Sequence, residues 1–357
     1  MLQQFFFSGF LSLVMASTVL ANEMRLNHIQ IIGTHNSYHI EPQKEILAAL
    51  NSMHHEDLSF SLQYTHPSMR EQLGIQNIRH LELDVFYDPE GNHYSKRKGL
   101  ELVGIHAPKI PELSLPGFKV LHIQDLDFLT QCILLTKCLQ DIKKWSDENP
   151  QHLPIFINIE PKFQSIEGTP AIDFTVPLPI DEHFLKDLDQ EITSVIPREK
   201  ILTPDDVRGS YSTLEKALLE TGWPLLHQVL GKFIFIFDNS GDGRDLYLKM
   251  HPGLQDAVLF TTAKAVGLPE SAIFFEGDLA RIPSLVRSGY IVRTRADGGP
   301  KDAQQNNVVG RDAALSSGAH LVDTDYPVPD PRFSADYQVT FSNNKKARCN
   351  PLFTCAE

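Results

Sequence analysis

Residues His28–Tyr38 read HIQIIGTHNSY, an apolar and β-branched run that changes directly into polar residues. Such a run predicts a buried strand, and polar residues after a strand are typical of a site built at strand ends. The same design recurs at Ile78–Val85 (IRHLELDV) and at Pro154–Glu160 (PIFINIE). Short apolar runs alternate with helical patterns along the rest of the chain.

Eight predicted strands interleaved with helices over roughly 300 residues indicate the α/β class, as a distorted (β/α)8 TIM barrel. Seven strands are predicted at His28–Thr34, Ile78–Val85, Leu102–His106, Pro154–Glu160, Lys232–Asp238, Tyr290–Arg295 and Ala319–Asp323. For the remaining strand, the sixth in chain order, Ala257–Thr261 and Ala272–Phe275 compete. Helices are predicted at Pro42–Met53, Leu139–Ser146, Glu182–Val195, Thr213–Thr221 and Ala280–Ser288. A long insertion over Lys162–Gly231 makes the predicted barrel irregular.

Composition narrows the class of protein. The 357 residues are 42% hydrophobic and carry 32 Lys and Arg against 45 Asp and Glu, a formal net charge of −13. This composition is typical of a globular protein and excludes a disordered or fibrous chain. The acidic balance argues against nucleic-acid binding and against attachment to anionic lipid by bulk electrostatics. We expect a monomer.

The N-terminus predicts export. Phe5–Ala21 is apolar and ends in the small-residue pattern Val19-Leu20-Ala21. At about 17 residues it is shorter than a membrane span, which needs ~20. The leader Met1–Gln4 lacks Lys and Arg, a departure from the usual pattern, and an uncleaved anchor is the alternative. We predict a signal peptide over residues 1–21, one catalytic barrel domain over residues 22–357, and a secreted or periplasmic protein.

The four cysteines, an even number in an exported chain, predict disulfides. Three pairings are open, and the two equal spacings of six residues favour Cys132–Cys138 and Cys349–Cys355. Six residues of α-helix rise ~9 Å, beyond the ~7 Å Cα separation that a disulfide tolerates. The stretch from Cys132 to Cys138 therefore cannot be one unbroken helix if the two are paired.

The predicted strand ends carry a set of oxygen ligands. Glu82 and Asp84 are two residues apart on a strand, so both side chains project to one face, where they repel unless a proton or cation intervenes. Together with Glu160 and the amide oxygen of Asn36 they form the hard-donor set that Ca²⁺ prefers, and zinc is less suitable. The alternative is that the Glu82–Asp84 pair only hydrogen-bonds Arg79 or a loop amide.

Two histidines follow different predicted strands. His35 and His106 are expected at the same layer of the barrel, where they supply an acid and a base near neutral pH. His39, His54, His55, His93 and His122 lack this context and are interpreted as structural.

The runs IIGTHNSY, LELDVF, GIHAP and FINIEPK resemble the X-region of phosphoinositide-specific phospholipase C, and most closely its secreted, calcium-dependent bacterial and fungal branch. Further similar segments, such as VLHIQDLDF and GAHLVDTDYP, extend the resemblance over essentially the whole mature chain. The resemblance implies a Ca²⁺-dependent hydrolase acting on a phosphoinositide lipid, or a related phosphodiester, at a membrane surface.

The resemblance also implies roles for single residues. It makes His35 and His106 catalytic and leaves open whether Glu82, Glu160 or His35 removes the proton of the inositol 2-hydroxyl. The implied calcium ligands are Asn36, Glu82, Asp84 and Glu160, and the candidates for substrate binding are Lys162, Arg293, Arg295 and Tyr326. A cyclic phosphate would form and then be opened by water. The alternatives are another metal phosphodiesterase on this barrel, such as a glycerophosphodiesterase or a sphingomyelinase D-like enzyme, and a non-catalytic inositol-phosphate or calcium-binding protein.

Overall fold

The computed structural model describes residues 24–165, 173–333 and 336–355. The predicted signal peptide, residues 1–21, lies outside the described residues. Within the described part of the chain, no helix combines the length and the hydropathy needed to cross a bilayer.

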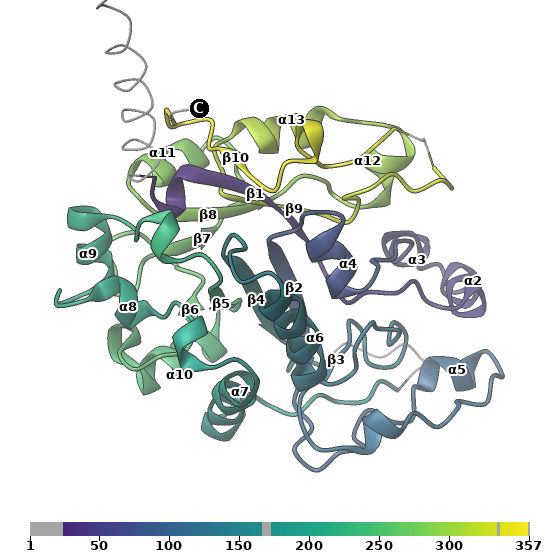
Figure 1. The fold of residues 1–357 in the computed structure, drawn as a ribbon. Helices are drawn as coiled ribbons and strands as arrows, with labels where there is room; N and C mark the ends of the chain where they lie inside the picture. The colour runs from purple at the N-terminus through teal and green to yellow at the C-terminus, as the bar shows by residue number, and fades with distance from the viewer. Residues whose placement is uncertain (1–23, 166–172, 334–335, 356–357) are drawn as a thin grey trace, which may run out of the picture.

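Eight parallel strands form a nearly closed barrel with helices around it (Figure 1). They are β1 (Ile29–Thr34), β2 (His80–Phe86), β4 (Ile155–Pro161), β5 (Phe233–Phe237), β6 (Phe260–Thr261), β7 (Ile273–Phe275), β8 (Ile291–Arg295) and β9 (Leu321–Thr324). They are hydrogen-bonded in the order β6-β5-β4-β2-β1-β9-β8-β7, and a single parallel bridge between Thr262 and Ile273 joins the two ends. The prediction of a distorted (β/α)8 barrel is confirmed.

One predicted strand is wrong and both competing segments are strands. The chain over Leu102–His106 ends helix α5 (Lys98–Leu102) and continues as a loop, while β6 and β7 both join the barrel. Leu102, Val103 and Ile105 pack against a second apolar cluster that lies outside the barrel. Their apolar pattern therefore reflects this satellite cluster, so the predicted count of eight is right although its third member is not.

Helices and short antiparallel strands complete the fold. The α-helices are α2 (Lys44–Ser52), α3 (Glu56–Ser61), α4 (Met69–Gly74), α5 (Lys98–Leu102), α6 (Leu135–Glu148), α7 (Glu182–Val195), α8 (Pro204–Arg208), α9 (Leu214–Thr221), α10 (Asp242–Met250), α11 (Ile282–Arg287), α12 (Pro300–Gln304) and α13 (Val309–Ser316). Short 3-10 helices span Leu26–His28, Pro111–Ser114, Arg198–Lys200, Leu226–Gln228, Pro252–Leu254 and Ser342–Asn344. Strand β3 (Lys119–Val120) pairs antiparallel with β2, and β10 (Arg348–Cys349) pairs antiparallel with β1.

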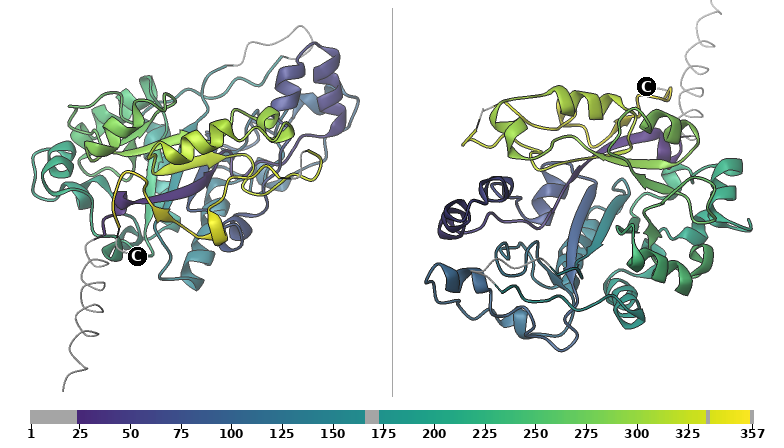
Figure 2. Two further views of the ribbon diagram at one scale, coloured as in Figure 1. Left: turned by 90° about the horizontal axis from the view of Figure 1, so that it is seen from above. Right: turned by 180° about the vertical axis from the view of Figure 1, so that it is seen from behind.

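The long excursions after β1 and β2 lie at the carboxyl end of the barrel. They carry α2, α3 and α5, which project on the side opposite α8 and α9 in all three views (Figures 1 and 2). Because active sites of such barrels lie at the carboxyl ends of the strands, these excursions border the region where a site is expected.

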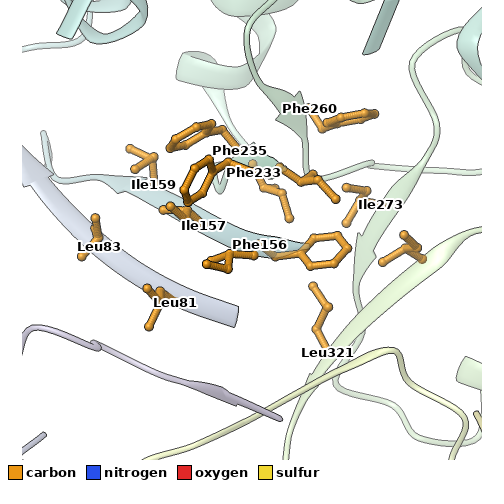
Figure 3. Close-up of a cluster of buried hydrophobic side chains, with 14 of the residues drawn as sticks. Leu81, Leu83, Phe156, Ile157, Ile159, Phe233, Phe235, Phe260, Ile273 and Leu321 are labelled. Carbon is orange, nitrogen blue, oxygen red and sulfur yellow. The ribbon is translucent and has the colours of Figure 1, made fainter. Parts of the chain in front are cut away.

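The barrel interior is apolar at its amino end and polar above. Phe156 of β4 projects toward Ile273 of β7 and Leu321 of β9 across the barrel (Figure 3). Two residues further along β4 and β9, at the same face of each strand, lie Asn158 and Asp323. The apolar layer therefore forms a floor, and every inward side chain above it can contribute to a polar site.

Local sequence explains helix α7. The side chain of Asp181 accepts a hydrogen bond from the backbone N–H of Phe184 and caps the helix. Phe184, Leu188 and Ile192 recur every four residues and are buried, so one face of the helix packs on the barrel.

Both predicted disulfides are confirmed. Cys132 precedes α6 and Cys138 lies in its second turn, with their Cα atoms 5.3 Å apart. The helix thus begins between the two cysteines, as the pairing required. The Cα atoms of Cys349 and Cys355, near the C-terminus, are 5.9 Å apart.

Candidate active site

The turn after β1 is attached to β2 by two backbone contacts of Ser37. Its N–H donates to the carbonyl oxygen of Glu82 at 3.0 Å, and its Oγ accepts from the N–H of Glu82 at 2.8 Å. Asn36, just before it, has a φ of 44°, a left-handed conformation that Asn tolerates better than most residues. The turn therefore carries Asn36 next to the strand that bears Glu82.

Gly33 of β1 has no space for a side chain. A Cβ at this position would collide with the carboxylate of Asp323 and the ring of His80. The absence of a side chain at Gly33 thus allows Asp323 and His80 to pack directly against β1, the strand that precedes His35.

Three carboxylates converge above the floor of the barrel. In the parallel register of β2 and β4, Asp84 pairs with Glu160, and Glu82 lies on the same face of β2. One carboxylate oxygen of each residue lies within 4.8 Å of those of the other two. Burial raises the pKa of Glu82 and of Asp84, even though Arg293 and Lys162 oppose the shift. Because Arg79 instead donates to the carbonyl oxygens of Leu73 and Ile78, its suggested pairing with this cluster is wrong.

The cluster fits a hard divalent cation. Asp84 is fully buried, and its Oδ1 has no hydrogen-bond partner among the described residues. The ammonium of Lys162 lies beside the cluster, with its Nζ 2.9 Å from Asp84 Oδ2 and 2.5 Å from Glu160 Oε1. A positive charge is therefore already stabilised between two of the predicted ligands. Asn36 is buried, its Nδ2 donates to Tyr64, and its Oδ1 accepts from Tyr38.

Arg293 is the counter-ion of the inner carboxylates. Its guanidinium pairs with Glu82, Asp238 and Asp323, which come from three different strand ends. Burial lowers the pKa of Arg293, but these carboxylates outweigh it and hold the pKa above its usual value. Arg293 borders the cavity as expected, yet its charge is taken up by carboxylates. We therefore interpret it as a support for Glu82 rather than as a phosphate ligand.

Arg295 and His35 share a carboxylate. Arg295 Nη2 lies 2.9 Å from Asp325 Oδ2, and His35 Nδ1 lies 2.9 Å from Asp325 Oδ1. The pKa of His35 is lowered to about 4, mainly by burial and next by the charge of Arg295. Asp325 opposes this shift. His35 is thus held as a neutral ring with its Nδ1 engaged.

His106 does not join the site. It is exposed on the loop after α5 and is not among the residues that line the cavity beside Glu82. The prediction failed because it rested on a strand over Leu102–His106, and this segment packs against the satellite cluster instead.

His122 occupies the place that was predicted for His106. It follows β3, lines the same cavity as His35, and its Nδ1 lies 2.7 Å from Asp127 Oδ2. Burial lowers its pKa, but the hydrogen bond and charge of Asp127 outweigh burial, so that the pKa is raised overall. The preceding strand has only two residues, too short to be read from the sequence. The signal that could have found His122 is its place in the family-like segment VLHIQDLDF.

Tyr326 is also misplaced by the sequence prediction. It is 2% exposed and borders a different hollow, on the far side of Asp325. Tyr326 is therefore not positioned to contact a substrate beside Glu82.

Beside Glu82 lies a cavity of about 740 Å³. Its polar lining includes His35, Glu82, His122, Glu160, Lys162, Asp238, Arg293 and Arg295. Phe275 of β7 borders it as well, is 48% exposed, and packs against the guanidinium of Arg293. Asp238 borders the cavity because it lies one residue beyond β5.

Comparisons with known proteins place this geometry in a family. The model of the family described as phosphoinositide phospholipase C, Ca²⁺-dependent, matches residues 24–351. The solved calcium-dependent phosphoinositol-specific phospholipase C of a Pseudomonas species, described with myoinositol, is 17% identical with a TM-score of 0.56, over 92% of this chain and 96% of that one. The Ca²⁺-dependent enzyme of Streptomyces antibioticus is 16% identical with a TM-score of 0.56, over 85% of this chain and 95% of that one.

At this level of identity the solved structures establish the fold, and the family model establishes the family. No curated protein matches the sequence. The family match does not favour the other phosphodiesterases of this barrel or a non-catalytic binding protein. The chain belongs to the Ca²⁺-dependent phosphoinositide phospholipase C family and is a phosphoric diester hydrolase that uses Ca²⁺.

Proposed function

We propose that the chain cleaves the phosphodiester of phosphatidylinositol-type lipids through a cyclic inositol phosphate, with His35 and His122 as its acid–base pair. One observation carries this proposal. Both rings line one cavity, and in each ring Nδ1 lies against a carboxylate, that of Asp325 or that of Asp127. The second nitrogen of each ring, Nε2, is therefore left to exchange protons in the cavity.

The two histidines receive opposite roles. His35 accepts the proton of the inositol 2-hydroxyl, and His122 donates a proton to the departing diacylglycerol oxygen. Their surroundings support this division, because the pKa of His35 is lowered and that of His122 is raised. In the second step the roles reverse, and His122 removes a proton from the water that opens the cyclic phosphate.

The metal and the phosphate are held by separate groups. Asn36, Glu82, Asp84 and Glu160 would hold Ca²⁺, which supplies a Lewis acid that acidifies a bound hydroxyl and neutralises phosphate charge. Lys162 and Arg295 border the cavity and are assigned to the phosphate oxygens. Arg293 keeps Glu82 in place.

Phosphorus NMR of the products from phosphatidylinositol tests this proposal. We expect a cyclic inositol phosphate followed by inositol phosphate, and loss of both signals in EGTA. His122→Gln and His35→Gln should each lower kcat by ~10²–10⁴, the usual contribution of an acid–base group. His106→Gln is the matched control and should retain wild-type activity. An inactive H106Q with an active H122Q would overturn the assignment.

We infer that the substrate is taken from a membrane surface. Phe275 supports this, because it is a half-exposed apolar ring at the border of the cavity. Sedimentation with vesicles containing phosphatidylinositol should show weaker binding for Phe275→Ala, while hydrolysis of a short-chain soluble substrate falls less. Equal loss on both substrates would contradict a role in docking.

We also propose that the chain is exported, cleaved after Ala21, and monomeric over residues 22–357. The two disulfides support an oxidising compartment. Mass spectrometry of the exported protein should give a chain that begins at Asn22, and sedimentation velocity should give a single monomer. A protein that retains residues 1–21 would instead support the uncleaved anchor.

A further inference from the structure

His39 is a fully buried histidine with a hydrogen-bond acceptor at each ring nitrogen. Nδ1 lies 3.0 Å from the carbonyl oxygen of Tyr64, and Nε2 lies 2.7 Å from Asp127 Oδ2. A carbonyl oxygen accepts only, and so does an ionised carboxylate. With Asp127 ionised, Nε2 of His39 therefore donates to its Oδ2.

Asp127 joins His39 to the catalytic candidate His122. Its Oδ2 faces Nε2 of His39 and Nδ1 of His122, both at 2.7 Å. Its other oxygen, Oδ1, is buried and has no hydrogen-bond partner among the described residues. Burial raises the pKa of Asp127, but the two histidines outweigh it and lower the pKa overall. The carboxylate is thus fixed as an anion by the two rings.

The position of His39 is set by the same turn that carries the site. Its backbone N–H donates to the carbonyl oxygen of Asn36 at 2.8 Å. Its ring stacks on Tyr64 at 4.1 Å between centroids and meets His122 edge-on at 5.9 Å. The ring therefore has no freedom to turn away from Asp127.

We propose that His39 is a positioning residue that acts through Asp127 on His122. Through the hydrogen bond from its Nε2 it holds Oδ2 against Nδ1 of His122, fixes the tautomer of that ring, and leaves Nε2 of His122 for the cavity. This inference rests on the proposed role of His122 as proton donor. It assigns a function to a histidine that the sequence indicated only as structural.

Two substitutions separate the donor from the ring. His39→Phe retains the stacking on Tyr64 and removes the donor at Nε2, whereas the amide of His39→Gln can still donate to Asp127. We expect H39F to lower kcat by ~10–100-fold, the scale of losses when a partner behind a functional group is removed. KM and the Ca²⁺ dissociation constant should change less than about twofold, and H39Q should restore most of kcat. His152→Phe is the matched control, because His152 is buried with both nitrogens engaged at a distant site, and its kcat should stay at the wild-type value.

A double variant tests whether the two histidines act as one unit. H39F/H122Q should be no less active than H122Q alone, because a positioning residue has nothing left to position. Losses that multiply, or an H39F variant with wild-type kcat, would overturn the inference. An H122Q variant with full activity would instead overturn the proposed function.

The ring nitrogens can be observed directly in the wild-type protein if H39F does not fold. Long-range ¹H–¹⁵N spectra should show a proton on Nε2 of His39 and the proton of neutral His122 on Nδ1. An unprotonated Nε2 on His39 would contradict the inference.

Discussion

Lys162 and Arg293 divide the charge of the carboxylate cluster between them. Lys162 reaches Asp84 and Glu160 from the cavity, while Arg293 holds Glu82 from within the barrel. The two cations are not equivalent, since the first occupies the position that fits a metal and the second lies behind a ligand. Substituting each should therefore have different consequences.

Replacing Lys162 by Met should tighten Ca²⁺ binding. The ammonium competes for the oxygens of Asp84 and Glu160, and opposite charges about 3–4 Å apart interact by several kcal/mol at an intermediate dielectric. We expect the Ca²⁺ dissociation constant, measured by titration calorimetry, to fall by about tenfold or more while kcat/KM for phosphatidylinositol decreases. The control is Lys137→Met, which removes an exposed partner of Asp141. Weaker Ca²⁺ binding by K162M would contradict competition.

Replacing Arg293 by Met should destabilise the fold. Removing one partner of a buried ion pair leaves an uncompensated charge and costs about 3–5 kcal/mol. Here three carboxylates lose their counter-ion at once. Urea unfolding should show a loss in that range or above it, compared with below about 1 kcal/mol for Lys143→Met, whose pair with Asp147 lies on the surface. A loss for R293M as small as that of the control would indicate that the carboxylates are protonated.

The sequence predicts those parts of the site that follow from the regular geometry of long strands. The convergence of Glu82 and Asp84 follows from alternation on β2, and their approach to Glu160 follows from the parallel register. His122 could not be found in this way, because its place depends on a two-residue antiparallel strand and on a long excursion that folds back over β2. Local periodicity carries no information about such tertiary contacts.

At the scale of elements, β3 and the segment after His122 are connected to α6. The N–H of Val120 donates to the carbonyl oxygen of Ile133 at 2.7 Å, and the N–H of Leu135 donates to that of Phe118 at 3.0 Å. The disulfide Cys132–Cys138 lies within this connection. The second disulfide closes a loop of the same length at the C-terminus, so the two form a matched pair.

Removing each disulfide by a double Cys→Ala substitution should separate stability from catalysis. Each closes six residues of sequence, and the loop-entropy relation gives about 2 kcal/mol for either. Thermal unfolding should therefore shift to a similar extent. Only the Cys132/Cys138 variant should also lose kcat, because it loosens the segment that carries His122 and Asp127. Equal kcat in both variants would show that β3 alone holds His122.

The element order was predictable where strands are long and uniform. β1, β2, β4, β5, β8 and β9 were expected within two residues of their bounds, and β6 and β7 were recognised as competitors although both are real. They were hard to separate because they have two and three residues, and a single bridge joins them. The segment Leu102–His106 resembled a strand because apolar packing outside the barrel gives the same composition.

At the scale of the whole molecule, burial of acidic side chains couples stability to pH. Asp189 and Glu191 of α7 lie away from the cavity, and burial raises the pKa of each to about 7. Hydrogen bonds from Tyr247 to Asp189, and from the N–H of Phe118 to Glu191, oppose the shift without cancelling it. At these two positions the folded chain therefore binds more protons than the unfolded chain between about pH 4 and pH 7.

The contribution of these two groups to the free energy of unfolding should therefore be fully present at low pH. It should be lost as the pH rises through 7, because at these positions the unfolded state binds fewer protons than the native state. We expect the ionisation of these two groups to lower the free energy of unfolding in urea between pH 5 and pH 8. Asp189→Asn should remove part of this slope and raise the free energy of unfolding at pH 8 by about 2 kcal/mol. This gain is below the limit set by the pKa shift of Asp189, because each pKa unit corresponds to ~1.4 kcal/mol. Asp141→Asn, a surface change on α6, should leave the slope unchanged. A steeper decrease of the free energy of unfolding with pH in D189N would mean that the fold stabilises Asp189 as an anion. The acidic surface would then set the pH response.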